Sequence, residues 1–130
     1  MAIKLYQRRD QDRIDAATAQ REREDAAPRL CDTVPGLRTL RIQFEDRRAG
    51  SGLTAMSYSK PVVVASAPAT FEIRCMEPRC DGRHDLTTQI LLALRRNERS
   101  FSGESACNGI VGDQHCDHVL MYACTATYAA

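Results

Sequence analysis

Four of the six cysteines fall in two short segments rich in turn-forming residues. Cys75 and Cys80 stand in a stretch that contains a proline and a glycine, and Cys107 and Cys116 enclose a glycine-rich stretch typical of a hairpin loop. A turn in each segment can direct two sulfur atoms toward one point. Because Zn²⁺ prefers four soft ligands in a tetrahedron, the two pairs predict one zinc site formed by Cys75, Cys80, Cys107 and Cys116.

The two cysteine segments also share a local pattern. Cys80-Asp81-Gly82 and Cys107-Asn108-Gly109 both place a cysteine before an Asx residue and a glycine. Turns of this kind leave backbone amides free to donate hydrogen bonds to a thiolate, which holds a metal ligand in place. We therefore expect zinc-knuckle-like turns, although the spacing inside each pair exceeds the two-residue gap of the commonest zinc fingers.

Other roles for the thiols remain open. Six is an even number, so Cys31 and Cys124 would complete a disulfide framework, and unpaired buried thiols are a further alternative. His115 or His118 would be able to replace a cysteine ligand. The N-terminus shows no secretory pattern, so we expect a cytoplasmic chain, where reducing conditions favour a metal over disulfides. Export of the chain would reverse that expectation.

Composition limits the interior that the chain can build. Of 130 residues 43% are hydrophobic but only 5% are aromatic, and there is no Trp, so Leu, Ile, Val and Ala must supply the core. Small domains bury a modest share of their surface and often add a metal to compensate. We expect a charged helical arm over residues 1–30 and one zinc-stabilised domain over residues 31–130.

Hydrophobic periodicity assigns this domain to the α+β class. Leu40, Ile42 and Phe44 alternate with polar residues, as in a half-buried strand. Further strands are predicted over residues 60–65 as a short buried strand, 69–75, 101–107 with an interruption or bulge at Gly103, and 118–128 with both faces partly covered. Residues 47–52 are expected to form an exposed connection. The sheet is expected to be small, antiparallel or mixed, with one packed helix.

Two helices are expected. The arm has high helix propensity but few apolar residues after Leu5 and Ile14, so it should be solvated or docked on a partner. The packed helix should begin after Asp85, which can cap it, and its apolar residues recur at helical spacing: Leu86, Ile90, Ala93 and Leu94. No segment reaches the ~20 apolar residues that a membrane-spanning helix requires, so no membrane partner is expected.

The sequence argues against catalysis. An all-sulfur ligand set favours a closed, structural zinc site over an open catalytic one. A triad from Cys116, Asp117 and His118 is not expected, because adjacent strand residues point to opposite faces. No phosphate-binding glycine loop is present.

Three functions are consistent with a non-enzymatic chain with a net charge of +1. The first is a protein-interaction or assembly module, a small subunit of a larger complex. The alternative is an RNA- or DNA-binding zinc module, whose phosphate contacts would come from arginine clusters. A third possibility is a redox-linked module whose thiols release zinc on oxidation. The arginine clusters that would contact nucleic acid in the second hypothesis are Arg8, Arg9, Arg13, Arg47, Arg48, Arg95, Arg96 and Arg99.

Overall fold

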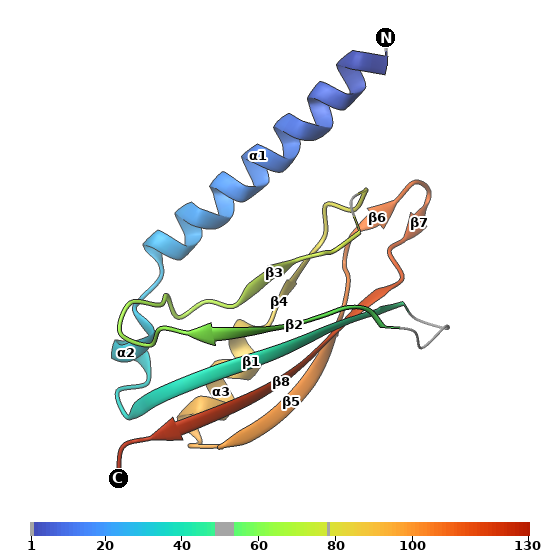
Figure 1. The fold of residues 1–130 in the computed structure, drawn as a ribbon. Coiled ribbons are helices and arrows are strands. Elements are labelled where there is room, and N and C mark those ends of the chain that lie inside the picture. Colours follow the sequence, from blue (N-terminus) through green and yellow to red (C-terminus); the bar gives the residue numbers. More distant parts are fainter. Residues whose placement is uncertain (1, 49–53, 78) are drawn as a thin grey trace.

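The computed structural model describes residues 2–48, 54–77 and 79–130. Its largest element is a four-stranded antiparallel sheet in the order β2-β1-β8-β5 (Figure 1). A helix, α3 (Thr87–Arg95), packs on one face of this sheet. The predicted α+β class is confirmed, and the sheet is antiparallel. The strands are β1 (Leu37–Arg48), β2 (Thr54–Val62), β5 (Ser100–Ala106) and β8 (His118–Tyr128).

The core lies between α3 and the inner face of the two central strands. Ile42 pairs with Cys124 and Phe44 with Tyr122, so that these four side chains share one face. All four are buried, whereas Gln43 between them faces solvent. The alternation predicted from Leu40, Ile42 and Phe44 is thus confirmed.

Helix α3 begins and packs as its sequence indicates. The Oδ1 atom of Asp85 accepts a hydrogen bond from the backbone N–H of Thr87 at 3.1 Å, which satisfies one of the free amides of the first turn. Leu86, Ile90 and Leu94 are fully buried against the sheet. Leu92, on the opposite side of the helix, is 47% exposed.

This difference predicts a large contrast between two leucines of one helix. Leu94→Ala should lower the free energy of unfolding by about 2–5 kcal/mol, because it leaves a cavity in the core. Leu92→Ala removes the same atoms from a solvent-facing position and should change it by less than about 0.5 kcal/mol. Urea unfolding of both variants measures the contrast, and equal losses would mean that α3 is not packed by this face.

Two predictions, one of a strand and one of a connection, place their residues in the wrong part of the sheet. Of the strand predicted as buried over residues 60–65, residues 60–62 form the end of β2, which begins at Thr54 and is an edge of the sheet, and residues 63–65 lie beyond that strand. Lys60, Pro61 and Val63 are exposed. An edge strand tolerates proline because one side of its backbone has no ladder partner. Arg47 and Arg48, expected in a connection, are the last residues of β1, and residues 49–52 of that prediction lie outside the described residues.

Two further strand predictions need correction, the second of them only in part. β5 continues through Gly103 without a register shift, so there is no bulge. A Cβ atom at Gly103 would lie 2.5 Å from the hydroxyl oxygen of Tyr122, so glycine is needed here to make room for the tyrosine ring. β8 buries one face along its length; on its other face Val119 and Met121 are partly covered, as predicted, but Ala123, Thr125 and Thr127 are exposed.

Short elements complete the chain. There are two small hairpins, β3 (Glu72–Arg74) with β4 (Arg83–Asp85) and β6 (Ile110–Val111) with β7 (Gln114–His115). The first lies near the middle of the sheet's length and the second toward one end (Figure 1). The hairpin predicted between Cys107 and Cys116 is therefore present. A four-residue helix, α2 (Leu30–Thr33), contributes the buried Leu30 to the core.

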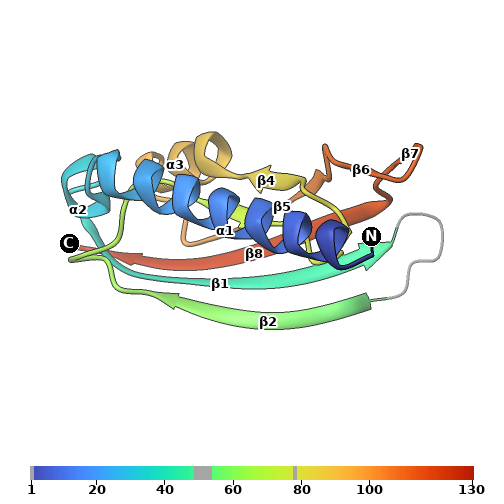
Figure 2. The ribbon, with the colours of Figure 1, turned by 90° about the horizontal axis from the view of Figure 1, so that it is seen from above.

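The N-terminal arm forms a long helix, α1 (Ala2–Ala26), on the same side of the sheet as α3 (Figure 2). Polar contacts join it to the rest of the chain. Gln20 Nε2 donates to the backbone oxygen of Glu72 at 3.0 Å, and Arg23 Nε donates to a carboxylate oxygen of Glu72 at 2.9 Å. Between residues 11 and 26, where side chains are described, none is buried.

Candidate metal centre

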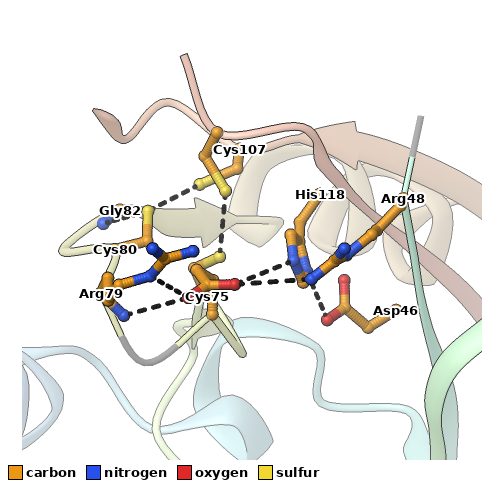
Figure 3. A network of polar contacts seen from close by, with 10 residues as sticks. Asp46, Arg48, Cys75, Arg79, Cys80, Gly82, Cys107 and His118 are labelled. Carbon is orange, nitrogen blue, oxygen red and sulfur yellow. Dashed lines mark hydrogen bonds and ion pairs between the residues drawn. The ribbon is translucent and has the colours of Figure 1, made fainter. Parts of the chain in front are cut away.

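The four cysteines predicted as ligands come together between the two small hairpins. Cys75 and Cys80 follow β3, and Cys107 and Cys116 stand on either side of the β6–β7 hairpin. Their Sγ atoms all lie within 4.8 Å of one another. Two sulfur–sulfur contacts each join one residue of each segment: Cys75 and Cys116 are 3.6 Å apart, and Cys80 and Cys107 are 3.6 Å apart. Figure 3 shows Cys75, Cys80 and Cys107 grouped beside His118.

The two loops repeat one pattern of backbone hydrogen bonds. The N–H of Gly82 donates to Cys80 Sγ at 3.3 Å, and the N–H of Gly109 donates to Cys107 Sγ at 3.3 Å. These are the amide-to-sulfur contacts that the Cys-Asx-Gly sequences predict. In addition, Cys75 N–H donates to the Gly82 oxygen and Cys116 N–H to the Gly109 oxygen, both at 3.0 Å. Each loop thereby fixes its two sulfur atoms relative to each other.

The sulfur positions fit a shared cation and not a disulfide. A disulfide would bring two sulfur atoms to about 2.05 Å, and all six cysteines are free. Metal–sulfur bonds of about 2.3 Å in a tetrahedron place the sulfur atoms about 3.8 Å apart, close to the 3.6 Å of the Cys75–Cys116 and Cys80–Cys107 pairs. The four cysteines are therefore able to hold a metal ion.

The four thiols lose their protons readily only when a cation lies among them. Burial raises the pKa of the Cys75 thiol, and the neighbouring thiols of Cys116 and Cys107 raise this pKa further. Four thiolates so close together repel one another unless a positive ion lies among them. A bound metal supplies that charge, so metal binding would be accompanied by proton release.

The remaining cysteines lie away from the cluster. Cys124 is fully buried in the core, where burial raises the pKa of its thiol to about 12, in line with the packing role predicted for it. Cys31 is partly exposed, with its Sγ 3.8 Å from the backbone oxygen of Ala65. Neither residue belongs to the four-sulfur group.

The two histidines named as substitute ligands differ in position. His115 is exposed in β7. His118 is buried and its Nδ1 atom lies 2.8 Å from Asp46 Oδ2. A second grouping, Cys116, Asp117 and His118, also has ligand atoms within 4.8 Å of one another. Asp117 is exposed, however, and Cys116 is shared with the four-sulfur group.

A buried polar layer beside the cluster was not predicted. Asp46, His84 and His118 are each at most 5% exposed. Asp46 pairs with His118, and His84 Nδ1 lies 3.1 Å from the hydroxyl oxygen of Ser105. The strand pattern held a signal for this layer, because Asp46 continues the buried face of Ile42 and Phe44 by alternation. A carboxylate on a buried face requires a partner, but sequence periodicity does not identify which residue it is.

Glu77 connects the cysteine loop to this layer. Its carboxylate contacts Arg79 Nε at 3.1 Å, His118 Nε2 at 3.7 Å and Arg48 at 3.8 Å (Figure 3 shows its three partners). The hydrogen bond from Arg79 holds the pKa of Glu77 below its usual value. These contacts tie the segment between Cys75 and Cys80 to the start of β8 and the end of β1.

His84 makes stability sensitive to acid. Burial holds the pKa of His84 below its ordinary value of 6.5, so the folded chain resists protonation that the unfolded chain accepts. The contribution of neutral His84 to stability is therefore full above about pH 6.5 and decreases as the pH falls toward the depressed pKa. We expect the stability difference between wild type and His84→Gln to be larger at pH 7.5 than at pH 5.5 in urea unfolding. A difference that is constant with pH would contradict this assignment.

Comparison with known proteins returns no match: no family model, no curated protein and no solved structure is similar to the chain. Within the described residues, none of the helices combines the length and the apolar character needed to cross a membrane.

Proposed function

We propose that the four cysteines bind one Zn²⁺ as a structural ion. The observation that carries the proposal is the convergence of four sulfur atoms from two loops, each loop holding its sulfurs with backbone amides. Thiolates select soft or borderline ions, and Zn²⁺ takes four of them in a tetrahedron. The ion would join two segments that are 27 to 41 residues apart in the chain.

The donor set supports a non-enzymatic role. Four protein ligands fill the tetrahedron and leave no position for a substrate or a water molecule, which a catalytic zinc requires. Zinc binding would instead add to the folding free energy, because the unfolded chain does not hold the four thiolates together. The small aliphatic core explains why such a cross-link is useful.

We further propose that α1 docks on a protein partner, so that the chain acts as an interaction or assembly module. A helix of 25 residues is about 37 Å long, and most helical stability in proteins comes from packing an apolar face. In the described part of α1, polar contacts through Arg13, Gln20 and Arg23 hold the helix, and Ile14 is 56% exposed. A partner surface would supply the packing that its own domain does not.

The test compares two exposed apolar residues in the full-length protein. Native mass spectrometry of protein purified from its own host should report one zinc ion and a bound protein partner. Ile14→Glu should remove the partner and leave zinc in place, whereas Val63→Glu, at an exposed turn after β2, should retain both. Partner retention in Ile14→Glu would contradict docking through this face, and absence of zinc from the wild type would contradict the structural site.

The nucleic-acid alternative is not favoured by the positions of its arginines. Arg48 pairs with His118 at the start of β8, and the backbone oxygen of Arg99 contacts Ala126 near its end. Eight residues of strand separate these positions by ~27 Å. Arg47 and Arg48 also face carboxylates, those of Glu45 and Glu77. The side chains of Arg8 and Arg9 lie outside the described set. Nucleic acid in place of a protein in the native complex would support the alternative.

A further inference from the structure

We propose that the four thiols are also a site of oxidative modification, at which a hydroperoxide converts them into two disulfides of defined pairing, Cys75–Cys116 and Cys80–Cys107. This inference uses the same residues as the proposed zinc site but rests on the positions of the sulfur atoms and on their exposure. It adds a second covalent state to the cluster.

The pairing follows from two sulfur–sulfur contacts that have hydrogen-bond geometry. Cys75 Sγ lies 3.6 Å from Cys116 Sγ, and Cys80 Sγ lies 3.6 Å from Cys107 Sγ. Both approaches join one loop to the other. Proximity in sequence would instead favour disulfides within each loop, Cys75–Cys80 and Cys107–Cys116. The close contact of the two loops favours the pairing between them: the backbone N–H of Arg83 donates to Asn108 Oδ1 at 3.1 Å, and a Cβ atom on Gly82 would lie 2.7 Å from the backbone nitrogen of Gly109.

Exposure gives the members of each pair different roles. Cys75 and Cys80 are partly exposed, whereas Cys107 and Cys116 are only 8% and 9% exposed. Each short approach thus joins an accessible thiol to a buried one. An accessible sulfur can meet an oxidant from solvent, and a buried sulfur next to it can resolve the product. This arrangement favours a disulfide over further oxidation of the accessible sulfur.

The chemistry balances with hydrogen peroxide as the oxidant. The thiolate of Cys80 attacks one peroxide oxygen, an S–O bond forms, the O–O bond breaks, and the departing hydroxide takes a proton to become water. The thiolate of Cys107 then attacks the sulfenic sulfur, the S–S bond forms, and the S–O bond breaks to release a second hydroxide, which is also protonated. Two electrons pass from the pair to one peroxide, with two protons consumed. Cys75 and Cys116 react in the same way with a second peroxide.

The oxidised chain would lose its metal and keep its cross-links. Disulfide sulfurs no longer offer thiolate charge, so a bound Zn²⁺ would be released without change of its own oxidation state. The two disulfides still join the loop after β3 to the segments that flank β6 and β7. Oxidation therefore replaces one cross-link by another between the same loops, and the sheet should persist. Disulfides within each loop would leave the two loops unconnected.

The experiment oxidises the full zinc-loaded protein with hydrogen peroxide and maps the disulfides. Trypsin cuts after Arg79 and separates Cys75 from Cys80, and an endoproteinase that cuts after Asp113 separates Cys107 from Cys116. Non-reducing mass spectrometry then identifies the linked peptides. A chromophoric chelator follows zinc release, and far-UV circular dichroism follows the sheet. A Cys31→Ser variant, altered at a cysteine outside the cluster, serves as the matched control.

We expect Cys75–Cys116 and Cys80–Cys107 as the dominant links, release of the bound zinc in step with them, an unchanged circular dichroism spectrum, and the same result in Cys31→Ser. Cys75–Cys80 and Cys107–Cys116 links, or sulfinic acids in place of disulfides, would overturn the inference and leave the zinc proposal standing. Protein that carries no zinc as purified would overturn the zinc proposal, and mapping its disulfides would still decide the pairing.

Discussion

Cys107→Ser is expected to abolish stoichiometric zinc binding and to lower the free energy of unfolding by at least about 3 kcal/mol. Cys107 is buried at the meeting point of the two loops, and its Sγ accepts the Gly109 amide. Serine binds Zn²⁺ poorly and would leave three thiolates with an incomplete tetrahedron. Metal analysis of the dialysed protein and urea unfolding in the presence of zinc measure the two effects.

The control for this variant is Cys124→Ala, which changes a buried cysteine outside the cluster. It should cost about 1 kcal/mol through lost packing and leave zinc binding intact. A metal chelator should reduce the stability of the wild type and of Cys124→Ala, but should have little further effect on Cys107→Ser. If Cys107→Ser retained zinc with wild-type stability, the four-sulfur site would be wrong.

Gly82→Ala should lower the free energy of unfolding by roughly 1–3 kcal/mol and zinc affinity by at least about tenfold. A Cβ atom on Gly82 would lie 2.5 Å from Cys107 Sγ and 2.7 Å from the backbone nitrogen of Gly109. Backbone cannot rotate away as a flexible side chain can, so the two loops would have to separate. That separation moves the sulfur atoms of opposite loops apart and weakens the site without removing a ligand.

Gly36→Ala is the matched control, because a Cβ atom there would meet nothing within 4 Å. It should leave both stability and zinc affinity close to wild type. Competition with a zinc indicator gives the affinities, and thermal unfolding gives the stabilities. Equal behaviour of Gly82→Ala and Gly36→Ala would show that the loops are not in the close contact described.

The sequence was sufficient for the features that depend on local pattern. The alternation of Leu40, Ile42 and Phe44 located a central strand, and helical spacing located α3 with the Asp85 side chain at its start. The repeated Cys-Asx-Gly turns predicted the amide-to-sulfur contacts and the convergence of the four thiols. Each of these inferences needs only short segments whose geometry is set by a few neighbouring residues.

Features that depend on distant pairing could not be obtained in this way. Residues 60–65 have the composition of a buried strand, but their burial depends on whether β2 is central or an edge, which periodicity does not decide. The pairing of Asp46 with His118 spans 72 positions in the chain. Glu72 likewise pairs with both Arg23 of α1 and Arg83 of β4 through the two oxygens of its carboxylate. Only the folded chain brings these three residues together.

The most direct test of the four-sulfur centre is zinc X-ray absorption spectroscopy on the protein as purified. We predict a single zinc environment with four sulfur neighbours at about 2.3 Å and no nitrogen or oxygen in the first coordination shell. A spectrum with nitrogen or oxygen ligands would move the site to a different set of residues. Protein without zinc, with the same cysteines joined in disulfides under reducing purification, would contradict the account.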